Sequence, residues 1–184
     1  MRASLSNKKM LIAGVQGTGK TYLAKNIARH YKTVVYSPHT YEWKNENVLL
    51  WESEDYKREL GFFCTYIKEQ GQKYELVIFD EADLLFNSNF DTVPEIKDMV
   101  VNHRHPPYRK AIIFATRRMQ DIPTRFYGTC EYLALFANES PQVRQLLNKY
   151  NDGLGDMVAS IPFGSHQFVL KKIGERPRLM KAGP

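Results

Sequence analysis

The sequence has no apolar run long enough to cross a membrane and only 2 cysteines. No stretch approaches the roughly 20 apolar residues that a transmembrane helix requires. The first residues, MRASLSNKKM, lack the apolar core of a secretory signal peptide. Cys64 and Cys130 form no CxxC pair, which argues against a disulfide framework or a zinc site. We therefore expect a cytoplasmic protein without a membrane span, in which both cysteines are buried as small hydrophobic residues.

Repeated and compositionally biased tracts are also missing. With 43% hydrophobic, 25% charged and 12% aromatic residues, the composition is that of a folded globular protein. The 184 residues fit one domain, so we expect a single domain over 1–184, with 151–184 as a C-terminal extension. The net charge of +6 favours a polyanionic partner, because basic side chains that neutralise phosphates release condensed counterions. The charge alone does not identify that partner.

Short apolar runs alternate with longer, more polar segments along the chain. The apolar runs predict strands over 10–13, 33–36, 75–79, 111–115 and 131–136. The segments between them predict helices over 20–31, 55–70, 94–103 and 141–150. Such alternation is typical of a mostly parallel sheet in an α/β protein. The strand runs are apolar on consecutive residues, which is expected when helices cover both faces of the sheet.

The last part of the chain has a different pattern. Residues 151–155 have the composition of a turn-rich connection. Two strand-like segments follow, at 166–171 and 178–181, and they predict a small C-terminal β-hairpin. Nothing in its composition indicates what the hairpin does.

A glycine-rich segment follows the first apolar run. GVQGTGKT matches GxxxxGK[ST] without a gap, between MLIA and the helix-compatible TYLAKNIARHY. Glycines let backbone N–H groups wrap phosphates, and the positive end of the following helix points at the same anion. We expect Lys20 to reach the β and γ phosphates of ATP, and the Thr21 hydroxyl to coordinate Mg²⁺. The segment is Gly14, Val15, Gln16, Gly17, Thr18, Gly19, Lys20 and Thr21.

Two carboxylates end the third predicted strand. The run LVIF is followed directly by Asp80 and Glu81. We expect Asp80 to lie beside the water shell of the metal ion. Glu81, one residue further, can act as general base on a water aimed at the γ phosphate, which favours hydrolysis over simple binding. Asp83 is interpreted instead as a solvated acid.

Arginines flank the fourth predicted strand. In this architecture the strand lies between the phosphate loop and the acidic strand, where Thr116 at its end could bond the attacking water. An arginine reaching a neighbouring subunit's phosphate can accelerate hydrolysis by ~10³ to 10⁵ and would require a ring. The alternative is that these arginines are solvated or contact DNA phosphates, and we expect His103 and His105 to be surface residues. The candidate arginines are Arg104, Arg117 and Arg118.

From Gly14 to about Leu147 the chain resembles the FtsK and HerA class of P-loop DNA translocases. That class includes the small genome-packaging ATPases of membrane-containing double-stranded DNA viruses. Beyond the two motifs, the resemblance rests on the order of four segments that look like the family's post-sensor strand and helix. These segments are 113–118, 122–123, 130–136 and 140–147. The chain departs from the family at Arg117, where a glutamine sensor is usual, and at Met119, where proline is common.

The resemblance implies a three-layer RecA-like fold and hexameric rings that pull duplex DNA through a central channel. It further implies docking to a virion or capsid protein, and a place in the host cytoplasm or with the virion. A chain this short lacks the membrane anchor and winged helix of the cellular translocases, so a viral packaging motor fits better. The implied site residues are Lys20, Thr21, Asp80 and Glu81 at the nucleotide, Thr116 or Arg117 as sensor, and Arg104 or Arg118 across subunits.

Three other functions fit parts of the pattern. A small P-loop kinase shares the loop, with 117–125 as an arginine-rich lid, but Glu81 would activate the water that a kinase must exclude. A Zot-like phage assembly or secretion ATPase shares both motifs but normally carries a membrane helix. A nucleotide-gated adaptor would use ATP to order the loops at 87–92 and the arginine segment. For DNA contact, 117–125 and 87–91 are both hypotheses.

Overall fold

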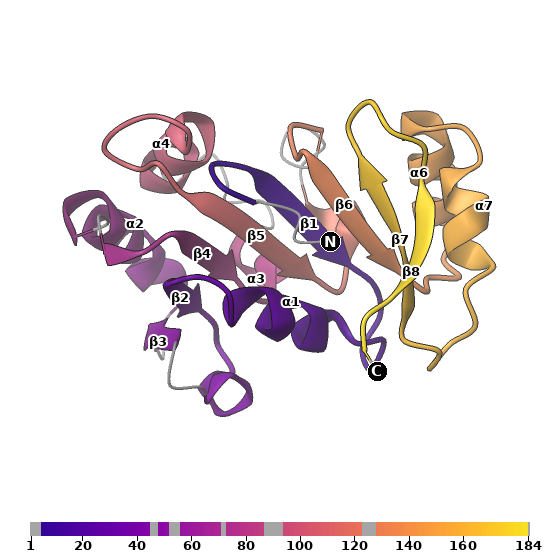
Figure 1. Ribbon diagram of the computed structural model, residues 1–184, viewed down its shortest axis with the longest axis horizontal. Helices are drawn as coiled ribbons and strands as arrows, with labels where there is room; N and C mark the ends of the chain where they lie inside the picture. The colour runs from indigo at the N-terminus through magenta and orange to yellow at the C-terminus, as the bar shows by residue number, and fades with distance from the viewer. Residues whose placement is uncertain are drawn as a thin grey trace.

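The computed structural model describes residues 5–44, 48–51, 56–70, 73–86, 94–122 and 128–183 (Figure 1). Its centre is an 8-stranded sheet with the order β3-β2-β4-β5-β1-β6-β7-β8. Strands β1 to β6 pair in parallel, whereas β7 and β8 are antiparallel. The strands are β1 (Lys9–Ala13), β2 (Thr33–Tyr36), β3 (Val48–Trp51), β4 (Leu76–Phe79), β5 (Ala111–Thr116), β6 (Tyr132–Phe136), β7 (Gln167–Lys172) and β8 (Arg178–Lys181).

Helices cover both faces of this sheet, because alternate residues of each central strand point to opposite faces. Leu11 and Phe114 belong to a core with α2, α4, α6 and α7, whereas Ile12 and Ile113 belong to a second core with α1 and the C-terminal hairpin. The helices are α1 (Lys20–Ala28), α2 (Tyr56–Gln70), α3 (Ala82–Phe86), α4 (Pro94–Asn102), α6 (Pro141–Tyr150) and α7 (Leu154–Ala159), with short 3₁₀ turns η1 (Thr40–Trp43) and η4 (Met119–Asp121).

The architecture confirms the predicted α/β fold with a mostly parallel sheet and a small C-terminal hairpin. All the predicted strands and helices are present within a few residues of their expected bounds. Strand β3 and helix α3 were not predicted. The segment 151–155 is not simply a turn, because α7 begins at Leu154 after the left-handed Gly153, and buried Leu154 and Val158 hold it in the core with α6.

Parallel pairing gathers the functional segments at one edge of the sheet. The phosphate loop follows β1, the acidic pair follows β4, and Arg117 follows β5. As expected, β5 lies between the other two, with Thr116 opposite Ala13 and Phe114 opposite Phe79. In open α/β sheets ligands bind outside the carboxyl ends of the strands, which is where these segments meet.

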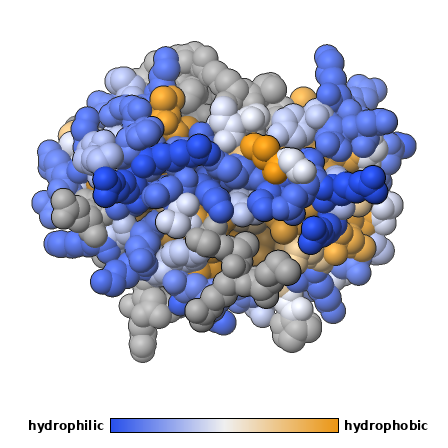
Figure 2. Space-filling model, turned by 45° about the horizontal axis from the view of Figure 1, so that its top comes forward, coloured by the Kyte–Doolittle hydropathy of each residue, from blue (hydrophilic) through white to orange (hydrophobic). Residues whose placement is uncertain are grey.

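The surface and the cysteines can be described from the structure. On the face that Figure 2 shows, the described side chains are mostly hydrophilic, and hydrophobic ones occur in small separate groups. No helix within the described ranges is long and apolar enough to cross a membrane. Cys64 and Cys130 are both buried, as predicted. Burial raises the pKa of the Cys130 thiol to about 12, so that it stays protonated.

Candidate active site

The phosphate loop has a backbone that only glycine accommodates at several positions. Gly17 and Gly19 have φ angles of 80° and 105°, in the left-handed region that favours glycine. A Cβ atom on Gly14 would lie 2.6 Å from Cβ of Phe136 at the end of β6. The Thr18 hydroxyl donates a hydrogen bond to the carbonyl of Val15 at 2.8 Å. The loop is therefore shaped by its own sequence and braced against β6.

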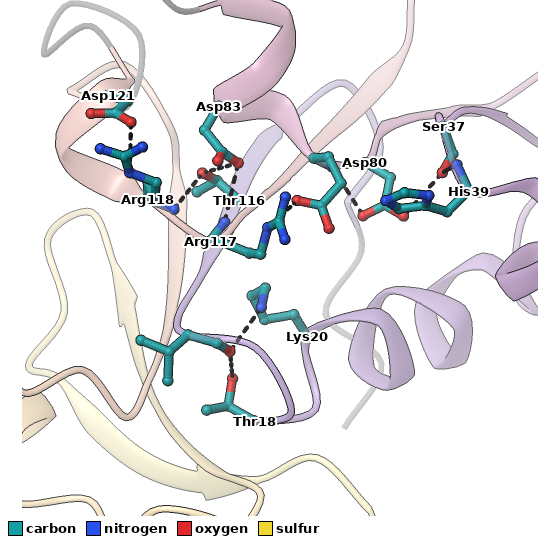
Figure 3. Close-up of polar contacts among 12 residues, drawn as sticks. Thr18, Lys20, Ser37, His39, Asp80, Asp83, Thr116, Arg117, Arg118 and Asp121 are labelled. Carbon is teal, nitrogen blue, oxygen red and sulfur yellow. Dashed lines mark hydrogen bonds and ion pairs between the residues drawn. The ribbon is translucent and has the colours of Figure 1, made fainter. Parts of the chain in front are cut away.

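A cavity of ≈ 420 Å³ opens between this loop and the acidic strand (Figure 3). It brings together the phosphate loop, the acidic pair, the end of β5 and the segment after β2. A larger cavity of ≈ 670 Å³ lies at the opposite edge, around Tyr31, Tyr74 and Tyr108, and includes no residue of either motif. The smaller cavity is lined by Gln16, Gly17, Gly19, Lys20, Thr21, Tyr22, His39, Tyr41, Glu42, Asp80, Glu81, Ala115 and Arg117.

Lys20 lies inside this cavity and bonds to its own loop. Its Nζ donates a hydrogen bond to the carbonyl of Val15 at 2.9 Å. Burial lowers the pKa of Lys20, while the nearby carboxylates of Glu81 and Asp80 act in the opposite direction. A phosphate oxygen is a charged acceptor and bonds an ammonium more strongly than a neutral carbonyl does. Lys20 is thus placed to exchange its internal partner for a nucleotide phosphate.

Asp80 is held rigidly by donors from the segment after β2. Its Oδ2 accepts hydrogen bonds from Trp43 Nε1 at 2.7 Å and from Ser37 Oγ at 3.2 Å, and its Oδ1 accepts one from the Glu81 N–H at 3.1 Å. A carboxylate has about four acceptor positions, so Oδ1 keeps room for a metal ion or its water. Sequence reasoning did not find Ser37 and Trp43; a polar residue directly after a buried strand was the only signal.

The oxygen atoms at this edge suit Mg²⁺. The Thr21 hydroxyl and the Asp80 carboxylate line the same cavity. Mg²⁺ prefers oxygen ligands and is usually held by one or two carboxylates together with phosphate oxygens and water. Among the described residues no cluster of three or more His, Cys, Asp and Glu side chains could hold a metal by itself. The Thr21 hydroxyl and the Asp80 carboxylate therefore fit Mg²⁺ that is also held by phosphate oxygens.

Glu81 is engaged by an arginine. Its Oε2 forms an ion pair with Nε of Arg117 at 2.7 Å, although the alignment is not that of a hydrogen bond. Burial raises the pKa of Glu81 above its ordinary value, and the Arg117 guanidinium opposes this shift. The backbone of Glu81 has φ of 50°, a left-handed conformation that non-glycine residues adopt at a cost. In this arrangement Glu81 lines the cavity, and its carboxylate forms an ion pair with Arg117.

Asp83 is a buried acceptor, so the expectation of a solvated acid was wrong. Only 4% of its surface is exposed, because α3 begins directly after Glu81 and places Asp83 against the end of β5. Its Oδ1 accepts hydrogen bonds from Thr116 Oγ1 at 2.9 Å and from the Arg117 N–H at 3.2 Å. Thr116 is fully buried and does not line the cavity, whereas Arg117 does. A sensor role for Thr116 stays a prediction.

Comparisons with known proteins agree with this geometry. Residues 10–137 match the model of the family "ATPase family associated with various cellular activities (AAA)". The chain belongs to the AAA family. Accordingly it is an ATPase. The matched range includes the phosphate loop, the acidic pair and β5, and the comparison with curated proteins gave no match.

Solved structures with the same fold as this AAA ATPase include a viral packaging enzyme. The genome-packaging NTPase B204 of Sulfolobus turreted icosahedral virus 2, in complex with sulfate, has 17% sequence identity and a TM-score of 0.78, with 95% of this chain and 96% of that chain covered. Its complex with ATPγS has 16% sequence identity and a TM-score of 0.77, with 95% of this chain and 97% of that chain covered. The type VII secretion ATPase EccC of Thermomonospora curvata has 13% identity and a TM-score of 0.69, with 94% of this chain but 25% of that chain covered. These likenesses confirm the resemblance to small packaging ATPases at the level of the fold.

The candidate trans-acting arginines of this AAA ATPase lie in different places. Arg118 follows β5 at the rim of the site and pairs with Asp121 at 2.9 Å, with 64% of its side chain exposed. Arg104 precedes β5, at the opposite edge, and pairs with Glu131. The structure therefore brings Arg118 near the cavity, whereas Arg104 lies far from it. The roles of both across subunits stay predictions.

The two histidines that were expected at the surface differ in their burial. His105 is exposed as predicted, but His103 is buried at 3% exposure, so its expected surface position was wrong. The reason is that the chain turns inward after α4, and His103 Nδ1 lies 3.0 Å from the carbonyl of Val100. The loop hypotheses at 87–91 and 87–92, and residues 123–125 of the segment 117–125, lie outside the described residues.

Proposed function

We propose that this AAA ATPase is a ring-forming motor, expected to be a hexamer, that uses ATP hydrolysis to package double-stranded viral DNA. One observation carries the proposal: Lys20, Asp80, Glu81 and Arg117 line one cavity at the carboxyl edge of the sheet. The likeness to a packaging NTPase over 95% of this chain and 96% of the other supports the choice of substrate. We further propose that it acts in the host cytoplasm or with the virion, docked to a capsid protein.

Hydrolysis follows from the placement of these side chains. Lys20 and the backbone of the phosphate loop bind the β and γ phosphates. Thr21 and Asp80 would hold Mg²⁺, which when bound neutralises charge on the phosphate oxygens. Water attacks the γ phosphorus, its proton passes to the Glu81 carboxylate, and the bond to the ADP oxygen breaks. Because burial raises the pKa of Glu81, that carboxylate is a stronger base than a solvated one.

The Arg117 contact makes the state of Glu81 depend on the nucleotide. While Arg117 is paired with Glu81, the carboxylate is directed at a cation instead of a water molecule. A γ phosphate entering the cavity offers Arg117 a second anionic partner. We infer that Arg117 moves toward the phosphate and leaves Glu81 to bind the attacking water, which is a sensor role.

The DNA part of the proposal rests on charge and on the fold likeness. The net charge of +6 suits a polyanion, and contacts to DNA phosphates are sensitive to salt. We would measure steady-state ATP hydrolysis with and without duplex DNA at rising salt, together with the mass of the assembly in solution. DNA should stimulate hydrolysis at low salt, and the stimulation should vanish as salt rises. Hydrolysis that ignores DNA at every salt concentration would contradict DNA translocation.

The same assay tests Glu81 as the general base. Glu81→Gln should lower turnover by about 10² to 10⁴, the usual contribution of general base catalysis, while ATP still binds. Glu139→Gln is the matched control, since Glu139 is exposed and lies outside the cavity. Wild-type turnover in Glu81→Gln would remove this residue from the mechanism.

An arginine acting across subunits can be identified by mixing variants. Lys20→Ala should lack ATP binding but keep its arginines, whereas Arg118→Ala should bind ATP but lack one arginine. If Arg118 acts in trans, mixing the two inactive proteins restores hydrolysis. Each Arg118→Ala subunit can bind ATP, and a neighbouring Lys20→Ala subunit supplies the Arg118 side chain. The same mixing with Arg104→Ala tests the other candidate. No recovery in either mixture would contradict trans action.

A secretion or assembly ATPase is the second candidate function. It is favoured by the TM-score of 0.69 to the EccC domain, although the likeness covers only 25% of that protein. A motor of that kind would hydrolyse ATP without responding to duplex DNA. The kinase alternative is disfavoured, because Glu81 lines the cavity where water would have to be excluded. The intact Lys20, Asp80 and Glu81 equally disfavour a non-catalytic adaptor.

A further inference from the structure

The connection between α7 and β7 lies against the phosphate loop. His166 Nδ1 is 3.4 Å from the carbonyl of Thr18, and a Cβ atom on Gly19 would lie 3.1 Å from the same nitrogen. A Cβ atom on Gly17 would lie 3.9 Å from Cζ of the Phe163 ring. Figure 1 shows the C-terminal hairpin beside α1, and Asn26 on α1 donates a hydrogen bond to the carbonyl of Ala182. Residues 160–166 thus form a wall next to the loop.

Phe163 projects from this wall into solvent. Its side chain is 66% exposed, although the connection on either side of it is anchored. Ile161 is buried in the core, the Ser165 N–H donates to the carbonyl of Pro162, and the His166 carbonyl accepts from the Ala182 N–H at 2.9 Å. An anchored turn therefore carries the exposed ring at a place beside the phosphate loop.

The strand order decides which end of a nucleotide reaches Phe163. The γ phosphate is directed toward Asp80, Glu81 and Arg117, which follow β4 and β5 on one side of β1. Phe163 comes from the connection into β7, on the other side of β1 beyond β6. Since the triphosphate runs past the loop from the catalytic groups, the nucleoside leaves the loop on the β6 and β7 side. His39 and Tyr41, the other aromatic groups near the cavity, follow β2 and lie on the γ-phosphate side.

We propose that Phe163 forms a nucleobase subsite, in which its ring stacks on the base of the nucleotide held by the phosphate loop. This inference rests on the proposed ATP binding and assigns a role to the C-terminal extension. Stacking of an aromatic side chain on a base contributes to affinity without reading the identity of the base. Phe163 supplies no hydrogen-bonding group, so the ligand class is any nucleoside triphosphate, whatever its base.

The test compares a ligand that has a base with one that lacks it. We would measure binding of magnesium ATP and of magnesium tripolyphosphate by calorimetry. Phe163→Ala should weaken ATP binding about tenfold, which corresponds to one stacked base, and leave tripolyphosphate binding unchanged. Phe62→Ala is the matched control, because Phe62 is 63% exposed on α2, away from the loop. Phe163→Trp should keep ATP affinity and show fluorescence quenching with ATP but not with tripolyphosphate.

The outcomes separate this inference from the function on which it rests. Tripolyphosphate binding with equal ATP affinity in wild type and Phe163→Ala would overturn the subsite and leave the phosphate site intact. Equal weakening of both ligands in Phe163→Ala would also overturn it, since the side chain would then be supporting the loop. Failure of the wild type to bind either ligand would overturn the proposed function and the subsite together.

Discussion

Charged residues gather at both edges of the sheet, but they are paired in different ways. At the amino edge, Lys9, His103, Arg104 and Glu131 form what we call the amino-edge cluster. Lys9 Nζ donates to the Thr129 hydroxyl at 2.7 Å, and the Lys9 N–H donates to Glu131 Oε2 at 2.6 Å. Glu131 also pairs with Arg104. The charged groups of this cluster thus pair within the protein and line no part of the ≈ 420 Å³ cavity, although Glu131 Oε1 has no well-aligned hydrogen bond.

At the carboxyl edge the same types of residue surround a cavity. Lys20, Asp80, Glu81 and Arg117, the nucleotide cluster, line the ≈ 420 Å³ space. Lys20 Nζ donates a hydrogen bond to the neutral carbonyl of Val15, and Glu81 Oε2, like Glu131 Oε1, has an ion pair without a well-aligned hydrogen bond. Burial of charge is costly unless partners satisfy it. The comparison suggests that the amino-edge cluster serves stability, whereas the nucleotide cluster keeps its charge for a ligand.

Replacing the lysine of each cluster tests this comparison most strongly. Lys20→Met should lower ATP turnover by about 10² or more, because a preorganised cation on the phosphates is lost. Its free energy of unfolding should change little or rise, since a buried charge is replaced by an apolar chain of similar length. Steady-state hydrolysis and urea unfolding measure the two quantities. Turnover close to that of the wild type would contradict the role of Lys20.

Lys9→Met should show the opposite pattern. Without Lys9 Nζ, the Thr129 hydroxyl loses a charged donor in a partly buried position, so the free energy of unfolding should fall by about 1–3 kcal/mol. Turnover per folded molecule should stay at the wild-type value, because Lys9 is at the far edge of the sheet. A Lys9→Met protein that is stable but inactive would break the distinction between the two clusters.

The amino-edge cluster should also give stability a pH dependence through His103. Burial, with help from the nearby Lys9 charge, lowers the pKa of His103 from 6.5 to about 4. Below about pH 6.5 the unfolded chain binds a proton that the folded chain does not, so stability falls as pH falls toward 4. Between pH 7 and pH 5 the loss should be about 1–2 kcal/mol, allowing for screening by solvent. Urea unfolding measures it, and His103→Gln should show a flatter dependence.

Sequence could predict those features of this protein that depend on residues adjacent in the chain. The phosphate loop is eight consecutive residues, and Asp80 and Glu81 directly follow an apolar strand, so motif and context are read together. The strands were found because a sheet covered on both faces needs continuous apolar runs. β3 and α3 were missed because they are short, and α7 because its first residues have turn composition.

What sequence could not predict depends on contacts between distant segments. Trp43 reaches Asp80 across 37 positions, and Thr116 reaches Asp83 across 33. Neither pair leaves a trace in the local pattern, so Asp83 was taken for a solvated acid. Which of Thr116 and Arg117 lines the cavity likewise became known only from the side chains themselves. The exposure of Phe163 beside the phosphate loop became visible only when the C-terminal hairpin was placed next to α1.

The smallest expected effect concerns the ion pair between Arg117 and Glu81 in the nucleotide cluster. The Arg117 guanidinium holds the pKa of Glu81 below the value that burial alone would give it. In Arg117→Gln that influence is absent, so the pKa of Glu81 should rise. A general base works only when ionised, and the acid limb of the kcat/KM profile should therefore move to higher pH. We would measure kcat/KM at limiting ATP across the pH range, because it reports the pKa values of the free enzyme, in which Arg117 pairs with Glu81.

Arg118→Gln is the control for this shift. Arg118 is the next residue along the chain, but its side chain pairs with Asp121 and does not line the cavity. The acid limb of Arg118→Gln should therefore coincide with that of the wild type, even if an effect across subunits lowers its maximum. A limb of kcat/KM that stays in place in Arg117→Gln would contradict the effect of the ion pair on Glu81 in the free enzyme. At saturating ATP the limb should stay in place, because Arg117 then contacts the phosphate when Glu81 accepts the proton.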